Sequence, residues 1–169
     1  MLTRRGFSVI ELMIAILIVG ILASLAFPSF VTMMENLKIR TVTESLLAGT
    51  QLARAEAVRR NANVEFALNP GNGWTVSVGG ATIQSRPANE TNTQVIAVTV
   101  TPAGATKLTF NSLGRATANA DASASITQFA IDSTVIPSAK SKDLQIVIGT
   151  GGSVRMCDPN LASSDPRGC

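Results

Sequence analysis

The sequence predicts an α+β protein in which one long N-terminal helix packs against an antiparallel β-sheet head. An apolar run covers residues 7–27 and is followed, beyond Pro28, by a segment with helical periodicity that ends near residue 61. The rest of the chain holds short, alternating apolar segments separated by turn residues, with no second amphipathic helix. Short strands of this kind form an antiparallel sheet whose apolar face needs a covering layer, and the helix supplies it.

The first half of the helix has the dimensions of a membrane span. At about 1.5 Å per residue, the apolar run makes a helix roughly 31 Å long, close to the hydrocarbon thickness of a bilayer. Arg4 and Arg5 precede it. Because basic residues favour the cytoplasmic side, we expect the N-terminus inside the cell and everything after Phe27 outside.

Glu11 is the one charge inside the apolar run. A carboxylate in a spanning helix costs roughly 2.5–3.5 kcal/mol on insertion scales, and such residues usually have a partner and a function. No cation follows within one helical turn. The partner of Glu11 is therefore expected to be an N-terminal group or another molecule.

The second half of the helix is predicted to be amphipathic. Pro28 removes a helical hydrogen bond, so a kink is expected there. Beyond it, Glu56 and Arg60 are spaced to pair on the outer face, which we interpret as solvated. The apolar stripe recurs at three- and four-residue steps; its members are Ile39, Val42, Leu46, Gly49, Ala53 and Ala57.

The remaining residues indicate strands and turns. Turn residues cluster at 69–73, 79–80, 111–114 and 149–152, and the polar segments 84–93 and 115–125 are expected to be loops. The expected strands are 64–68, 74–78, 95–100, 107–110, 126–131, 144–148 and 153–157.

Composition excludes most catalytic sites. The chain has no His and no Tyr, which removes most acid–base and nucleophilic arrangements. Two Cys without His cannot complete a four-ligand zinc site, and no phosphate-binding loop is present. We therefore expect no enzyme, no metal and no cofactor. The formal charge of +3 includes Arg4 and Arg5 and is weak support for a nucleic-acid partner.

The two cysteines are Cys157 and Cys169, the last residue. The expected topology places both outside the cytoplasm, where disulfides persist. A bond between them would stabilise the fold by about 2–3 kcal/mol and fix the C-terminus. The alternative is two free thiols, and a redox pair is disfavoured because there is no C-x-x-C motif.

The stretch G-F-S-V-I-E at residues 6–11, followed by an apolar helix, resembles the leader signal of type IV prepilins and pseudopilins. The resemblance implies cleavage after Gly6, N-methylation of Phe7, and pairing of Glu11 with the N-terminal amine of a neighbouring subunit. It divides the chain into a leader (1–6), a transmembrane assembly helix (7–28) and a pilin head (29–169). The head would comprise the amphipathic helix at 29–61 and a β-rich region at 62–169.

Two other interpretations of the N-terminus stay open. Ser24-Leu25-Ala26 resembles the cleavage site of an ordinary secretory signal peptide. A simple uncleaved anchor is the second alternative. The first does not explain a charge in the apolar core, and the second explains neither Gly6-Phe7 nor Glu11.

Three later stretches resemble the FimT/FimU/GspH branch of this superfamily: Leu52–Val58, the turn from Phe110 to Arg115, and Val154–Pro159. The resemblance implies a minor pilin that helps prime a type IV pilus, held in the inner membrane with a periplasmic head. Its partners would be other pilins, through the helix, and the prepilin peptidase-methyltransferase. A pseudopilin of type II secretion is the alternative.

A second alternative is DNA capture. One branch of the family binds DNA through G-R-x-R, and the matching positions here, residues 152–155, keep only the second arginine, Arg155. Arg167 could add charge nearby. Phosphate contacts need clustered cations, so these two arginines give only weak support for a DNA-binding site.

Overall fold

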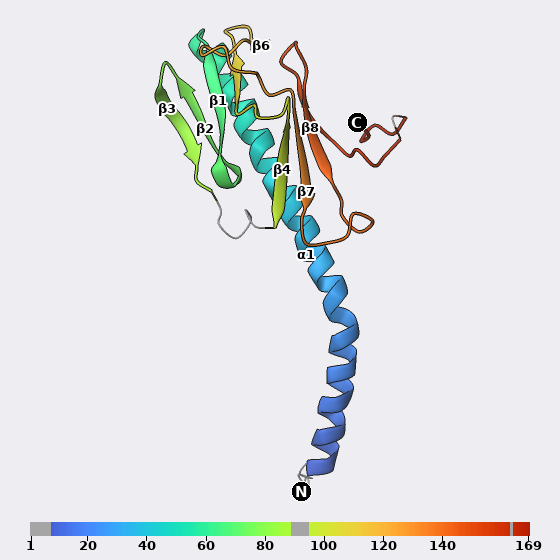
Figure 1. The fold of residues 1–169 in the computed structure, drawn as a ribbon. Coiled ribbons are helices and arrows are strands. Elements are labelled where there is room, and N and C mark those ends of the chain that lie inside the picture. Colours follow the sequence, from blue (N-terminus) through green and yellow to red (C-terminus); the bar gives the residue numbers. More distant parts are fainter. Residues whose placement is uncertain (1–7, 89–94, 163) are drawn as a thin grey trace, which may run out of the picture. The chain divides into compact units, whose positions relative to one another are not determined.

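The computed structural model describes residues 8–88, 95–162 and 164–169 (Figure 1). The chain forms two compact units, Met1–Met34 and Glu35–Cys169. Helix α1 (Val9–Arg60) is continuous and contributes residues to both. It ends within a residue of the predicted boundary, where Asn61 takes a left-handed conformation with φ of 52°.

The first unit consists of the apolar half of α1. Every described side chain up to residue 30 is exposed. The helix passes through Pro28 without a break.

The second half of α1 buries the predicted stripe. All six predicted positions are buried, with Ile39, Leu46 and Ala53 fully so. Thr43 and Thr50 are also buried, and each hydroxyl donates to the carbonyl four residues earlier, at 2.8 and 2.7 Å. Local bonds of this kind let a threonine sit inside a helix without an unsatisfied hydroxyl.

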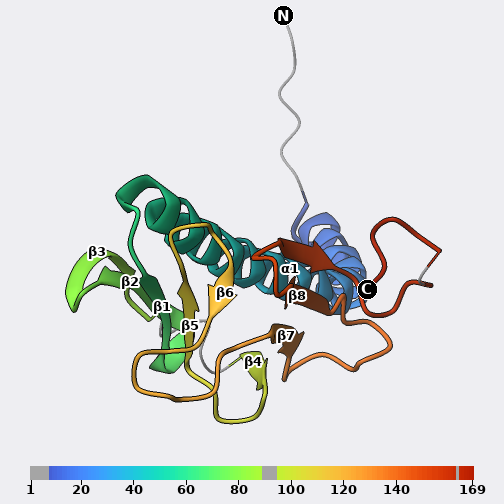
Figure 2. The same ribbon diagram turned by 90° about the horizontal axis from the view of Figure 1, so that it is seen from above.

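Two antiparallel sheets cover this half of the helix (Figures 1 and 2). The first has the strand order β3-β2-β1-β5-β6 and comprises β1 (Val64–Asn69), β2 (Gly73–Val78), β3 (Ala81–Arg86), β5 (Lys107–Phe110) and β6 (Ala116–Thr117). The second has the order β4-β7-β8-β9 and comprises β4 (Ile96–Thr101), β7 (Gln128–Ser133), β8 (Leu144–Ile148) and β9 (Val154–Cys157). A single 3-10 turn, η1 (Pro70–Asn72), lies between β1 and β2.

The structure differs from the predicted elements in three respects. The expectation of a loop at 84–93 was wrong for its first three residues, because they belong to β3, and 89–94 lie outside the described residues. Gly79 and Gly80, both at positive φ, form the predicted turn between β2 and β3. The expectation of a loop at 115–125 was wrong at Ala116 and Thr117, because these residues pair with β5 and form β6. The strands also divide into two sheets instead of one.

Aromatic side chains join the three layers of the core. Phe66 of β1 stacks on Trp74 of β2 and meets Phe129 of β7 edge to face, with ring centroids 6.1 and 6.0 Å apart. The Trp74 indole also donates to the Ser45 hydroxyl of α1 at 3.0 Å. It lies over Gly49, where an added Cβ would come within 2.8 Å of the ring. Gly49 therefore makes the slot that seats Trp74 on the helix.

Candidate functional site

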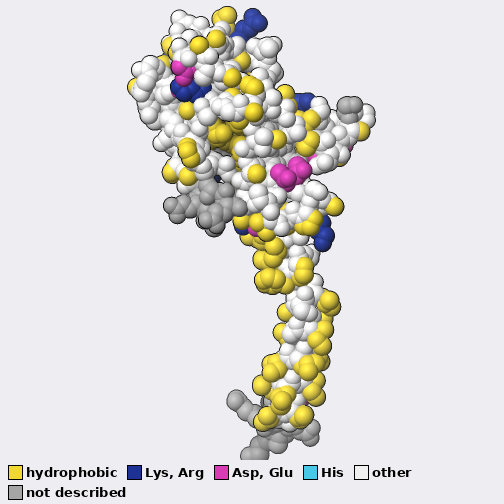
Figure 3. All heavy atoms as spheres, in the orientation of Figure 1, with side chains coloured by type: hydrophobic (Ala, Val, Ile, Leu, Met, Phe, Trp, Pro, Cys, Tyr) yellow, Lys and Arg dark blue, Asp and Glu magenta, His cyan; other side chains and the backbone are white. Residues whose placement is uncertain are grey.

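The apolar half of α1 is the first candidate site. In the described part of the chain, α1 is the one helix long and apolar enough to cross a membrane. Its most apolar 18-residue segment has a mean hydropathy of 2.7, and none of that segment is buried. Figure 3 shows hydrophobic side chains gathered along it. Exposed apolar surface of this extent is typical of a segment that contacts lipid or other helices.

Glu11 lies in the first turn of α1 and is exposed. Among the described residues it forms no ion pair. The helix therefore presents a single carboxylate within an apolar surface, as the sequence predicted. Gly6 and Phe7, the predicted processing site, lie outside the described residues.

The three stretches that resemble the FimT/FimU/GspH branch meet at one place in the head. The Arg54 side chain of α1 donates through Nε to the Gly114 carbonyl at 3.0 Å, across 60 residues of sequence. Gly152 approaches the same carbonyl so closely that a Cβ there would collide with it. Both glycines have positive φ, 70° and 83°. The Arg54 hydrogen bond thus joins the helix to the turn, and the close approach of Gly152, which only glycine permits, joins the turn to the residues just before the closing strand.

The end of α1 carries a compact charge cluster. Glu56 accepts hydrogen bonds from Arg59 and Arg60, both at 2.6 Å. These two bonds lower the pKa of Glu56 to about 2. The predicted pairing of Glu56 with Arg60 is confirmed, and Arg59 joins it. Because one carboxylate serves two guanidinium groups, the helix end keeps a net positive charge.

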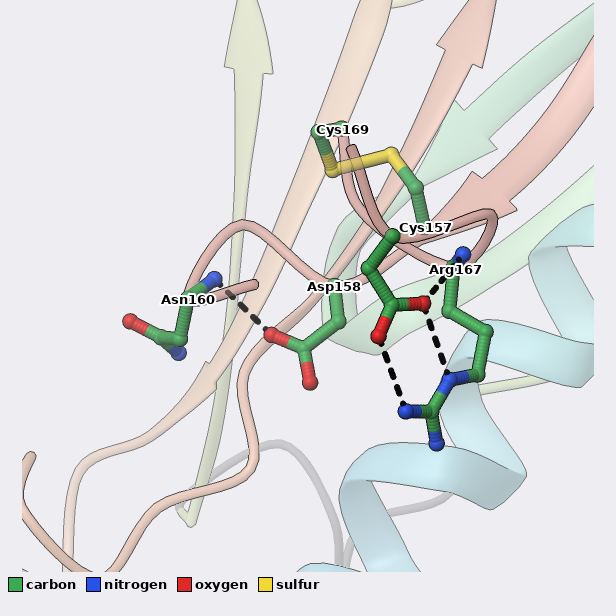
Figure 4. Close-up of a disulfide and its surroundings, with 6 residues drawn as sticks. Cys157, Asp158, Asn160, Arg167 and Cys169 are labelled. Carbon is green, nitrogen blue, oxygen red and sulfur yellow. Dashed lines mark hydrogen bonds and ion pairs between the residues drawn. A yellow bond between two sulfur atoms is a disulfide. The ribbon is translucent and has the colours of Figure 1, made fainter. Parts of the chain in front are cut away.

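The predicted disulfide between Cys157 and Cys169 is present (Figure 4). Cys157 is buried at the end of β9, whereas Cys169 is exposed. Backbone bonds close the loop beside it: Asp158 N–H donates to the Arg167 carbonyl at 2.7 Å, and Cys169 N–H donates to the Asp158 carbonyl at 3.3 Å. The bond ties the C-terminus to the edge strand of the second sheet.

Arg155 and Arg167 do not form a cation cluster. Arg155 is exposed on β9 and forms no ion pair with any described residue. Arg167 contacts Asp165 through two guanidinium nitrogens, at 3.2 and 3.1 Å (Figure 4). The Arg167 contact lowers the pKa of Asp165. Since Asp165 offsets the charge of Arg167, Arg155 is left as the unpaired cation of the two.

Sequence reasoning missed a carboxyl pair at the start of β8. Asp132 of β7 accepts from the Ser141 hydroxyl at 2.7 Å, and its side chain is hydrogen-bonded to that of Asp143, the residue just before β8. Burial and the neighbouring Asp132 raise the pKa of Asp143. In Asp132, hydrogen bonds from Asp143 and Ser141 outweigh burial and lower its pKa. Only pairing of the two strands brings these acids together, so no local pattern could have found them.

One long N-terminal helix packed against antiparallel sheets is a pilin-like fold. Its sequence matches the family described as "Type II transport protein GspH" over residues 42–152, and the "Prokaryotic N-terminal methylation motif" over residues 1–27. The protein is therefore a member of the GspH family.

Solved structures agree with this fold. Two crystal structures of the Pseudomonas aeruginosa type IV minor pilin FimU match with TM-scores of 0.57 and 0.53, at 15% and 16% identity. The matches cover 79% and 75% of this chain and 98% of each FimU chain. No curated protein sequence matches.

Proposed function

We propose that this protein is a minor pilin that assembles into a type IV pilus and helps to prime its polymerisation. The observation that carries the proposal is the apolar, exposed first half of α1 with its single carboxylate, continuous with a GspH-type head. Such a helix needs lipid before assembly and other helices after it.

The processing steps follow from the leader motif. A prepilin peptidase would cut between Gly6 and Phe7, removing residues 1–6, and the new Phe7 amine would be methylated. Before assembly the protein would cross the inner membrane once, with its N-terminus in the cytoplasm and its head in the periplasm. The two arginines of the leader support this orientation.

Glu11 would register each subunit against its neighbour. A carboxylate and an ammonium are each costly in an apolar environment and are tolerated when paired. The neighbour's N-terminal amine is the cation created by cleavage, and α1 presents Glu11 without a partner among the described residues. The pair would form only when subunits lie in the correct stagger.

A pseudopilin of a type II secretion system is the second candidate. The observation that favours it is the description of the matching family as a type II transport protein. The C-terminal disulfide loop favours the pilus, because a cysteine loop at this end is common in pilins.

The two candidates differ in what is lost when the gene is deleted. In a deletion strain complemented by the full chain, we expect surface pili to disappear and return while secreted proteins stay unchanged. Loss of secretion with normal pili would favour the pseudopilin.

The intact mass of the purified protein tests whether it belongs to the pilin class at all. A chain that begins at Phe7 with one added methyl group is expected, and one that begins at Phe27 would overturn both candidates.

A further inference from the structure

A groove runs along the C-terminal end of α1 in the head. It has a volume of about 510 Å³ and is lined by Gln51, Arg54, Ala55, Val58 and Arg59 of α1 and by Val154 of β9. The floor of the groove is apolar. The Val58 side chain is 54% exposed, although the same helix is packed against the sheets on its other face.

The turn that adjoins the groove extends both its apolar and its basic character. Gly114 packs against Val58, because a Cβ at Gly114 would lie 3.1 Å from the Val58 side chain. Leu113 and Arg115 flank Gly114 on either side. Leu113 is 75% exposed and Arg115 is exposed too. Apolar side chains left open to water beside a fixed turn indicate a contact surface.

Positive charge lies beside this apolar floor, because Arg54 and Arg59 line the groove and Arg115 belongs to the adjoining turn. Among the described residues, neither Arg54 nor Arg115 forms an ion pair. Arg59 shares the single carboxylate of Glu56 with Arg60. The rim therefore carries more guanidinium groups than carboxylates. The Arg54 side chain is also held in place by its bond to the Gly114 carbonyl, so part of the rim is ordered before any partner binds.

We propose that this groove binds an acidic segment of another protein subunit, with an apolar side chain on the floor at Val58 and carboxylates on the arginine rim. Charge complementarity selects such an occupant: bidentate guanidinium–carboxylate contacts give geometry as well as attraction. The inference rests on the proposed function, since a filament subunit must meet neighbours, but it concerns the head and not the apolar helix.

A photo-crosslinking residue at Val58 of the full chain, in the cells that make it, tests the proposal. Val135 provides the matched control, because it is also 54% exposed and lies outside the groove. We expect a crosslinked subunit at Val58 and not at Val135, attached through a segment that contains Asp or Glu. Absence of a product at Val58, or a product with nucleic acid, would overturn the proposal.

Charge variants then test the arginine rim. Arg59→Glu with Arg115→Glu should lower the Val58 crosslink by about tenfold, since like charges would face each other. Arg86→Glu with Lys142→Glu, at exposed positions outside the groove, should leave it unchanged. Exchanging the partner's acids for Lys should restore the crosslink to the first variant. If that variant does not accumulate, Arg59→Gln with Arg115→Gln replaces it. A crosslink insensitive to the rim charges, or not restored by the exchange, would contradict the proposal.

The filament fraction separates this inference from the proposed function. If the chain enters filaments but gives no rim-dependent crosslink at Val58, the groove proposal fails while the pilin role stands. If the chain never enters filaments, whatever the state of its groove, the pilin role itself fails.

Discussion

Gly49 shows how one missing side chain sets the contact between helix and sheet. A Cβ at this position would lie 2.8 Å from two carbons of the Trp74 ring and 2.9 Å from Phe66. Helix propensity alone would make alanine better than glycine by about 1 kcal/mol. Overpacking a core costs typically about 1–3 kcal/mol, and rigid rings leave little room for adjustment.

Since the gain in helix propensity offsets part of the overpacking cost, we expect Gly49→Ala to destabilise the head by up to about 2 kcal/mol. Thermal unfolding of the full chain in detergent, followed by the fluorescence of its single tryptophan, measures this directly. Gly151→Ala is the control, because nothing lies within 4 Å of a Cβ there. An unchanged or higher melting temperature for Gly49→Ala would show that the indole is not seated as described.

The carboxyl pair of Asp132 and Asp143 gives a pH-dependent prediction. Burial and Asp132 raise the pKa of Asp143 in the folded state. A raised pKa means that this group adds stability when protonated, and that the contribution is lost as the pH rises through the folded value. At neutral pH both carboxyl groups are ionised, so two like charges lie in contact, which is destabilising.

Asp143→Asn should therefore raise stability at pH 7, by about 0.2–1 kcal/mol, and have little effect near pH 3. Chemical denaturation at the two pH values measures the difference. Glu44→Gln, at an exposed helix ion pair, serves as the control and should change stability little at either pH. A stability loss at pH 7 in Asp143→Asn would indicate that the ionised carboxylate has a stabilising partner.

At the scale of elements, sequence patterns predicted the features that depend on neighbouring residues alone, such as the buried face of a helix. The stripe on α1 was confirmed at all six positions because a 3.6-residue period directly encodes one buried face. Strand β3 was missed because it is an edge strand with mostly exposed, polar side chains, so it lacks the apolar alternation of a half-buried strand. The buried Glu35 of α1, 6% exposed, was also missed, since its burial depends on what the helix packs against.

The disulfide loop holds the C-terminus against β9. Replacing both cysteines, Cys157→Ser with Cys169→Ser, should cost about 2–3 kcal/mol, the chain-entropy estimate for a short loop. The tail after β9 should become sensitive to protease at temperatures where the head is still folded. Proteolysis with mass detection, compared with the oxidised wild-type chain, tests this. Equal protease resistance would mean that the backbone bonds around Asp158 suffice to hold the tail.

At the scale of the whole molecule, the class of protein could be predicted because its leader and apolar helix are contiguous in sequence. The groove of the head could not be predicted from the sequence. Its lining comes from α1 and from Val154 of β9, about 100 residues beyond Arg54 along the chain, and the adjoining turn at Gly114 lies about 60 residues beyond Arg54. These segments meet only through tertiary packing. The division of the strands into two sheets was unpredictable for the same reason.

The assembly role of Glu11 is a prediction about many chains at once. Glu11→Ala should insert into the membrane at least as well as the wild type, because it removes a carboxylate that costs roughly 2.5–3.5 kcal/mol in the bilayer. It should nevertheless enter filaments poorly. The neighbour's terminal ammonium would be left unpaired in an apolar environment, at a cost of about 3–5 kcal/mol for a broken buried pair.

Two variants in the full chain separate insertion from assembly. Glu44→Ala, an exposed acid of the same helix paired with Arg40, is the matched control and should behave as wild type. The ratio of filament to membrane protein, measured in cells that also express the wild-type chain, should fall by more than about tenfold for Glu11→Ala alone. Equal ratios for the two variants would mean that the apolar surface of α1 drives assembly without charge pairing, and that Glu11 has another purpose.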